Sequence, residues 1–199
     1  MTPVKAKPRS SRETILKVSL QLFADLGYEG VAMRQIAKAA GVTLPAIYHH
    51  FNNKQELFNA VEAELYGAHA DSLLKALTAD VPAEQRLHDF ITRLMVSFED
   101  HPAYFKILQR NLVEGRPANQ GFLKESLQHV YDELKRMLNA FAPGSGEGAV
   151  PILIFSCIVG YETMRPAIDS LKGYPYAAVA RDQEREVLAN SIMGMIKRL

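Results

Sequence analysis

The sequence predicts an all-α protein of about nine helices, divided between an N-terminal domain at residues 1–56 and a larger domain at residues 57–199. Apolar residues recur at helical spacing along most of the chain. The alternating pattern of a strand, bounded by hairpin signals, does not stand out anywhere. Glycine and proline clusters separate the apolar segments and mark the expected helix ends.

Three short helices are expected in the N-terminal domain. The first spans residues 11–26, because Ser10 and Glu13 have the spacing of a capping box. The second ends at Gly41 and lacks a Ser, Thr, Asp or Asn at its start, so packing is expected to hold it in place. Thr43 can cap the third helix, whose first turn tolerates a proline because its N–H groups have no partner in the helix.

A longer helix should connect the two domains. It opens at Asn53 and Glu56 and runs to about residue 79. Breaks rich in glycine and proline separate the five helices that follow. Their expected ranges are 83–100, 103–114, 122–141, 150–170 and 177–198.

Positive charge gathers in the N-terminal domain. The formal net charge of the chain is +1, whereas residues 1–56 hold eight Lys or Arg against four Asp or Glu. The rest of the chain is therefore mildly acidic, and a polyanion is expected to meet the N-terminal domain. The basic stretch at residues 5–9 has two interpretations, a solvated tail or an arm that follows a DNA minor groove.

The sequence favours a cytoplasmic protein that makes no membrane contact. No apolar segment follows the charged N-terminus, and the longest uncharged apolar run, residues 149–161, is too short to span a bilayer. Cys157 is the only cysteine, so no intrachain disulfide is expected. Its expected role is that of a small buried hydrophobe.

The central motif of the N-terminal domain is a pair of short helices on either side of Gly41. Small Ala37 and Ala40 let the two helices approach closely, and the glycine takes a left-handed turn at little cost. This is the pattern of a helix-turn-helix, whose second helix enters the DNA major groove and points its N-terminal residues at base edges or phosphates. Here these residues are Thr43, Leu44, Pro45 and Ala46.

Other side chains complete a candidate DNA-binding surface. Leu44, Pro45 and Ala46 offer few hydrogen bonds, so base readout is expected to use thymine methyl groups and DNA shape. Arg34 and Gln35 of the preceding helix are expected to add polar contacts. Phosphate contacts are expected from Tyr48, His49, His50 and Lys54.

This segment closely resembles the tetracycline-repressor (TetR) family of regulators over about the first sixty residues. The resemblance rests on Ile15-Leu16, Leu22-Phe23-Ala24, Gly27-Tyr28, Met33 to Ala37, Ala40-Gly41-Val42, Ile47 to Phe51 and Lys54. It implies a nine-helix, Ω-like homodimer with a divergent ligand pocket in the larger domain. By the same similarity, residues 43–46 would read the groove, and Arg34, Tyr48, His49 and Lys54 would hold the DNA backbone. Met33 departs from the Thr or Ser of many members, which removes a hydroxyl that would contact a phosphate.

Aromatic and histidine residues of the third helix have alternative interpretations. Tyr48 and Phe51 are also suited to the core of the N-terminal domain. The adjacent His49 and His50 would point about 100° apart on a helix and have no third ligand nearby. Neither a metal nor another cofactor is therefore expected.

The larger domain carries aromatic and thioether side chains that either line a ligand pocket or fill a core. A pocket of this composition would take an apolar or aromatic small molecule, with Tyr161, Glu162 or Arg165 as a polar anchor. The candidate lining residues are Met95, Phe98, Phe105, Leu108, Phe155, Tyr161, Met164 and Arg165.

The last two helices carry enough apolar surface to pair with their copies in a second chain, and ordinary burial within one chain is the alternative. Their apolar residues include Ile152, Phe155, Val159, Val187, Ile192 and Ile196. The expected function is a homodimeric repressor that binds a palindromic double-stranded DNA operator until a small-molecule effector releases it. A DNA-binding dimer without an effector is the second hypothesis. An enzyme is not expected, because no nucleophile with a positioned base is evident.

Overall fold

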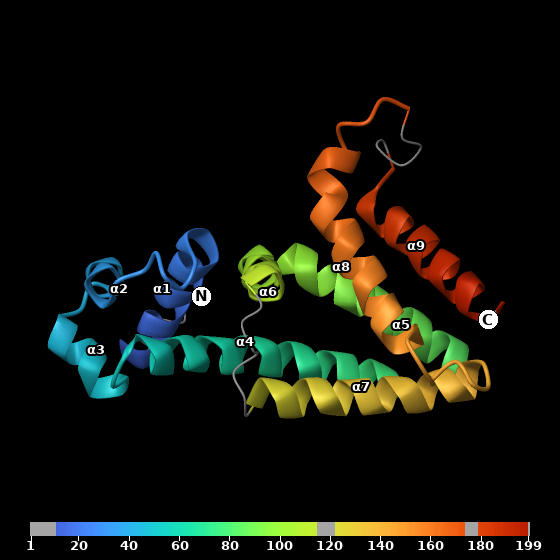
Figure 1. Ribbon diagram of the computed structural model, residues 1–199, viewed down its shortest axis with the longest axis horizontal. Helices are drawn as coiled ribbons and strands as arrows, with labels where there is room; N and C mark the ends of the chain where they lie inside the picture. The colour runs from blue at the N-terminus through green and yellow to red at the C-terminus, as the bar shows by residue number, and fades with distance from the viewer. Residues whose placement is uncertain (1–10, 115–121, 174–178, 199) are drawn as a thin grey trace, which may run out of the picture. The chain divides into compact units, whose positions relative to one another are not determined.

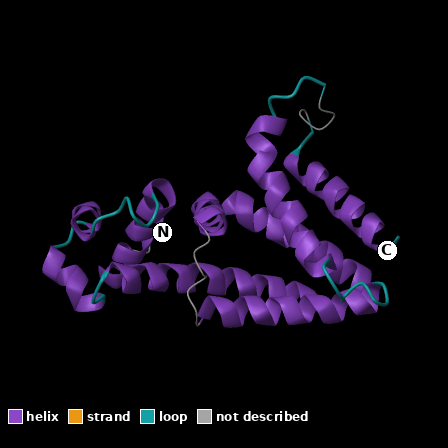
Figure 2. Ribbon diagram, viewed as in Figure 1, coloured by secondary structure: helices purple, strands orange, loops and turns teal. Residues whose placement is uncertain are grey.

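The computed structural model describes residues 11–114, 122–173 and 179–198, with the side chains of residues 122–126 left aside. Within these ranges the chain forms nine helices and no strand, so the predicted all-α class is confirmed (Figure 1, Figure 2). The helices are α1 (Ser11–Leu26), α2 (Met33–Ala40), α3 (Leu44–His50), α4 (Lys54–Leu77), α5 (Ala83–Asp100), α6 (Pro102–Glu114), α7 (Phe122–Phe141), α8 (Val150–Ile168) and α9 (Arg181–Ile196).

Most helix ends lie within two residues of the prediction. Helix α8 ends before Ser170, whose hydroxyl donates to the Ala167 carbonyl (2.6 Å) in the turn that follows the helix. The start predicted for α9 at residue 177 is wrong. The helix begins at Arg181, because the backbone of Ala180 is extended and its side chain offers no cap. Ser10, the expected cap of α1, lies outside the described residues.

The chain divides into two compact units. The described part of the first unit is residues 11–65 and 103–114, and the remaining described residues form the second. Helix α4 contributes to both units, as expected of a connecting helix. Helix α6 clusters with the helix-turn-helix in the first unit, although it follows residue 56, the predicted end of the N-terminal domain.

Side chains of α6 explain its place in the first unit. Ile107 is buried in the core of that unit. Lys106 forms an ion pair with Asp25 of α1 (2.7 Å). The Arg110 guanidinium donates to the carbonyls of Ala24 and Asp25 (3.3 and 3.0 Å), which lie in the last turn of α1, where helical carbonyls lack partners. Sequence periodicity does not reveal these contacts, because the partners lie more than 80 residues apart.

The core of the first unit is formed by α1, α2, α3, the first turns of α4, and α6. The ring of Phe23 meets the ring of Phe58 edge to face, with centroids 4.9 Å apart. Ile36 and Ile47 are fully buried and fix the two helices of the helix-turn-helix to this core. Phe51 is buried with them, which confirms its interpretation as a core residue.

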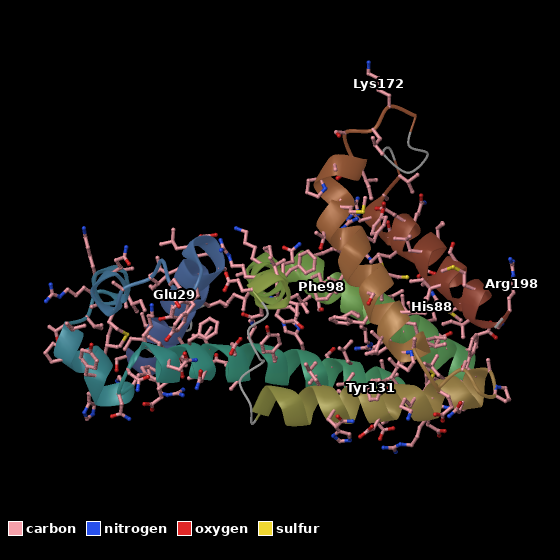
Figure 3. The ribbon with its side chains drawn as sticks, in the orientation of Figure 1. Glu29, His88, Phe98, Tyr131, Lys172 and Arg198 are labelled. Atoms are coloured by element: carbon pink, nitrogen blue, oxygen red, sulfur yellow. The ribbon has the colours of Figure 1, made fainter. Side chains whose placement is uncertain are left out.

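Helix α5 organises the second unit, because α7, α8 and α9 all pack against it. Its buried face consists of Leu87, Phe90, Ile91, Leu94, Met95 and Phe98, the last of which is labelled in Figure 3. Helix α8 buries Ile154 and Ile158. Cys157 lies beside these residues on the exposed side of α8, so the expectation that it is buried was wrong.

None of the helices in the described ranges combines the length and the apolar character that a membrane-spanning segment needs.

Candidate nucleic-acid interface

The turn before α3 contains a glycine in the left-handed backbone conformation, and the helix itself begins with a side-chain cap. Gly41 has φ 67°, and the Val42 amide closes its turn on the Ala37 carbonyl (3.0 Å). Any other residue would be strained at this φ, so the glycine permits the sharp turn between α2 and α3. Oγ1 of Thr43 accepts a hydrogen bond from the Ala46 amide (3.3 Å), which confirms the predicted cap.

The N-terminal face of α3 lies at the surface of the first unit. Ile47 points into the core, and this orientation directs its neighbours outward. Leu44 and Ala46 are half-buried at the edge of that face. Tyr48 is 48% exposed, so its interpretation as a core residue was wrong. The exposed residues are Thr43, Pro45, Tyr48 and His49.

Gln35 holds the start of α2. Its Oε1 accepts a hydrogen bond from the Ala32 amide (2.7 Å), so the prediction that packing alone holds this helix was wrong. A glutamine three residues after the cap position is half of a capping box, and this signal was present in the sequence. Met33 packs against the core, as its apolar side chain requires.

The exposed side of α2 carries two basic residues one helical turn apart. Arg34 was predicted as a DNA contact, whereas Lys38 was not. Residues four apart share a helix face, so Lys38 extends the positive surface that begins at Arg34. The same spacing, applied to the sequence, would have identified it.

Lys54 is tied into the first unit by its ammonium group. Its Nζ donates to the carbonyls of Tyr28 (2.9 Å) and Val31 (3.1 Å) and lies 4.2 Å from the centroid of the Tyr28 ring. The side chain therefore fastens the start of α4 to the segment between α1 and α2. Two of its three donors serve this internal role, which leaves one for the predicted phosphate contact.

The first residues of α1 are joined to α3. The ring Nε2 of His50 lies 2.7 Å from the Ser11 hydroxyl oxygen. The guanidinium carbon of Arg12 lies 5.5 Å from the ring centroid of Phe51, at the end of α3. These contacts place the first residues of α1 beside the end of α3. The basic stretch at residues 5–9 lies outside the described residues.

The structure distributes the predicted ligand-lining residues over both units. Phe105 and Leu108 are half-buried on α6, in the first unit. The remainder are in the second unit, where Met95 and Phe98 belong to its buried core and Met164 is 60% exposed. Phe155, Tyr161 and Arg165 are half-buried on α8.

The three predicted polar anchors are engaged with charged residues of the second unit. The Tyr161 hydroxyl donates to Glu184, and Nη1 of Arg165 lies 2.7 Å from the same carboxylate. Oε2 of Glu162 accepts from Arg181 (3.2 Å). Their partners on α5 and α9, which no local sequence signal indicates, are Glu99, Arg181, Glu184 and Arg185.

The fold and the surface together define a helix-turn-helix protein. The second helix of the motif, α3, begins with the Thr43 cap, is fixed to the core by Ile47 and has exposed residues along its N-terminal face. Comparison with known proteins identifies a similar family. Residues 15–61 match the family described as bacterial regulatory proteins, tetR family. This match covers α1 to α3 and the first turns of α4, so it is the helix-turn-helix segment that is similar to the tetR family.

One known repressor is similar to part of the sequence, and two solved structures share the fold. The transcriptional repressor AcnR of Corynebacterium glutamicum is 43% identical over 58 residues, 29% of this chain and 31% of the repressor, so the chain matches about a third of that relative's length. A tetR-family regulatory protein from Rhodococcus RHA1 has a TM-score of 0.72 at 18% identity over 96% of each chain. The regulator FadR from Bacillus subtilis, solved with stearoyl-CoA, has a TM-score of 0.68 at 19% identity over 92% of this chain and 96% of that one. All three are named as regulators or repressors, in agreement with the expectation that the chain is not an enzyme.

Proposed function

We propose that the protein is a cytoplasmic transcriptional regulator, a repressor that binds a palindromic DNA operator as a homodimer. The observation that carries this proposal is the exposed N-terminal face of α3, with Thr43 at its cap and the basic residues Arg34 and Lys38 on the neighbouring helix. The name of the repressor AcnR, which is 43% identical over 58 residues, supports it. In this proposal residues 43–46 meet base edges, with Gln35 adding a polar contact. Phosphate oxygens are met by Arg34, Tyr48, His49, His50 and Lys54.

Selection of bound sequences from random double-stranded DNA tests this function. Two recognition helices related by a two-fold axis should enrich an inverted repeat whose half-sites lie about 34–36 Å apart, or a small multiple of that distance. Enrichment of a site without two-fold symmetry would contradict the proposal that the protein binds its operator as a homodimer. If the selection recovered no sequence at all, the proposal that the protein is a DNA-binding regulator would be contradicted.

The second chain is proposed to pack on α8 and α9. Helix α8 presents a row with helical spacing, in which Leu153, Cys157 and Met164 are exposed and Gly160 is half-buried. A Cβ built on Gly160 meets nothing within 4 Å, so another helix has room to approach closely there. Ile152, Val187 and Met195 add exposed apolar surface. Of the residues predicted for this interface, Ile192 and Ile196 are instead buried within the chain.

Met164→Glu should convert the dimer to a monomer at micromolar concentration. The residue is 60% exposed, so the single chain accommodates the charge, whereas a paired helix would bury it without a partner. Size-exclusion chromatography with light scattering measures the change. Val113→Glu, which changes an 88% exposed residue on α6, is the matched control and should remain dimeric. An unchanged mass for Met164→Glu would place the interface elsewhere.

The effector is proposed to be a small apolar or aromatic molecule held by the second unit. Half-buried Phe155 and Tyr161 on α8 support this class, as does the stearoyl-CoA of the FadR structure with the same fold. Release requires that the effector bind the two states of the protein unequally, by about 1–3 kcal/mol. Repeating the operator titration with acyl-CoA thioesters and with aromatic acids tests it. Unchanged operator affinity at saturation by a bound compound would show that this compound is no effector.

A further inference from the structure

A cluster of charged side chains joins α5, α8 and α9 within the second unit. We name it the carboxyl–guanidinium cluster, and it consists of Glu99, Glu162, Arg165, Asp169, Arg181, Glu184 and Arg185. Four carboxyl groups here face three guanidinium groups. When all seven groups are ionised, the cluster therefore carries one excess negative charge. Most of its side chains are largely buried, with Asp169 as the exposed member.

Glu184 is the well-satisfied member of the cluster. It is 1% exposed and accepts from the Tyr161 hydroxyl. Its Oε2 lies 2.7 Å from Nη1 of Arg165 and 2.9 Å from Nη1 of Arg181. Hydrogen bonds from Tyr161 and Arg181, together with the neighbouring charge of Arg165, compensate the loss of hydration of this carboxylate.

Glu99 and Glu162 are arranged differently, because they compete for one donor. Nη2 of Arg181 lies 2.8 Å from Oε1 of Glu99 and 3.2 Å from Oε2 of Glu162. Each carboxylate has one oxygen with a hydrogen bond, Oε2 of Glu99 from Arg185 (2.6 Å) and Oε2 of Glu162 from Arg181. The Oε1 atom of each is buried without a hydrogen-bond partner in the described residues. The Glu162 side chain is only 7% exposed, so water does not compensate its Oε1 well.

One proton bound to the pair Glu99 and Glu162 lowers the electrostatic cost of the cluster in two ways. It cancels the repulsion between two carboxylates that face the same guanidinium nitrogen, and it neutralises the excess charge of the cluster. Burial, reinforced by the charge of Glu99, raises the pKa of Glu162 to about 7. Burial also raises the pKa of Glu99, in spite of the opposing charge of Arg185.

The other helices packed nearby place their charges elsewhere. On α7, His129 and Arg136 both pair with Glu133, and Lys135 pairs with Glu147. Further along α5 and α9, His88 pairs with Glu186 (2.8 Å; His88 is labelled in Figure 3). The groups that act on Glu162 are thus those of the carboxyl–guanidinium cluster, from α5, α8 and α9.

We propose that Glu99 and Glu162 share one proton, and that loss of this proton loosens the first turns of α9 from α5 and α8. Three residues of α9 join the cluster: Arg181 and Glu184 lie in its first turn, and Arg185 follows directly. Repulsion within the ionised pair therefore acts where α9 begins. The inference concerns the second unit alone, and it does not require that the chain bind DNA or dimerise.

The direction of the pH dependence follows from the pKa values. In the unfolded chain Glu162 has its ordinary pKa of 4.5, and in the folded chain its pKa is about 7. Below pH 4.5 both states hold the proton, and above pH 7 neither does. Between these values the folded state holds more protons than the unfolded state, so stability falls as pH rises through this window.

Thermal unfolding of the full chain at pH 5.5 and pH 7.5 tests the proposal. The apparent Tm of the wild type should fall between these two pH values by about 3 °C more than that of Glu162→Gln, whose side chain is neutral throughout. Asp71→Asn, at an exposed position of α4 in the same unit, is the control and should follow the wild type. Parallel profiles for all three proteins would overturn the proposal.

Two measurements on the wild type keep the test decisive if Glu162→Gln does not fold. Hydrogen exchange should show lower protection factors for the first turns of α9 at pH 7.5 than at pH 5.5, with no such change in the buried face of α5. A carboxyl ¹³C titration should find one glutamate with a midpoint near 7. Midpoints below about 5.5 for every glutamate would overturn the proposal while leaving the proposed DNA binding and dimerisation unaffected.

Discussion

Ala46→Glu is expected to weaken operator binding by at least about 100-fold, because the new carboxylate would face the negatively charged groove from the recognition helix. The same change should not unfold the first unit. Ala46 is the third residue of α3, and its amide already donates to Thr43. A glutamate at this position completes a capping box and complements the helix dipole. Fluorescence anisotropy with the selected operator measures the loss.

Ala46→Gln is the matched control for this prediction. It adds a side chain of the same size without the charge, so the difference between the two variants isolates electrostatic repulsion from steric conflict. Thermal unfolding of both variants should match the wild type within about 2 °C. If Ala46→Glu bound the operator as tightly as Ala46→Gln, the N-terminal face of α3 would not be the DNA contact.

Ile107→Ala is expected to lower the free energy of unfolding of the first unit by about 2–4 kcal/mol. The side chain is 2% exposed and lies in the core that α1, α2 and α3 share, so its truncation leaves a cavity there. Urea unfolding followed by hydrogen exchange in α1–α3 locates the effect. Destabilisation confined to α5, α7, α8 and α9 would show that α6 belongs to the larger domain after all.

Leu112→Ala on the same helix is the control for that prediction. Leu112 is 56% exposed, so its truncation should change the free energy of unfolding by less than about 0.5 kcal/mol. Comparison of the two variants separates core packing from a general effect on the helicity of α6, because both changes replace a large aliphatic residue with alanine in one helix.

Local signals in the sequence predicted most of the secondary structure, apart from the start of α9. Gly41 and Thr43 mark the turn of the helix-turn-helix through backbone conformation and capping, and both effects act over a few residues. The exposed positions of α3 follow from the same periodicity, because Ile47 fixes which side of this short helix faces the core. Most of the candidate DNA-binding surface was therefore predictable.

Contacts between distant segments were not predictable in this way. The packing of α6 against α1 depends on Arg110 and Ile107. The sequence alone does not indicate which carbonyl or which apolar surface of the fold these two side chains contact. The carboxyl–guanidinium cluster likewise combines three helices, and a Glu or Arg on a polar helix face ordinarily predicts solvent. Cys157 was misplaced for a related reason, since an apolar run cannot show which of its sides a second helix covers.

The hydrogen bond that Gln35 makes to its own helix limits what this residue can recognise on a nucleic acid. A glutamine that pairs with adenine uses both ends of its amide, one as donor to N7 and the other as acceptor from the N6 amino group. Here the Ala32 amide already occupies the oxygen. This bond holds the oxygen toward the helix, so the NH₂ end is the one that can turn outward. An NH₂ group suits partners that present lone pairs, such as a phosphate oxygen, the O6 and N7 of guanine, or the O4 of thymine.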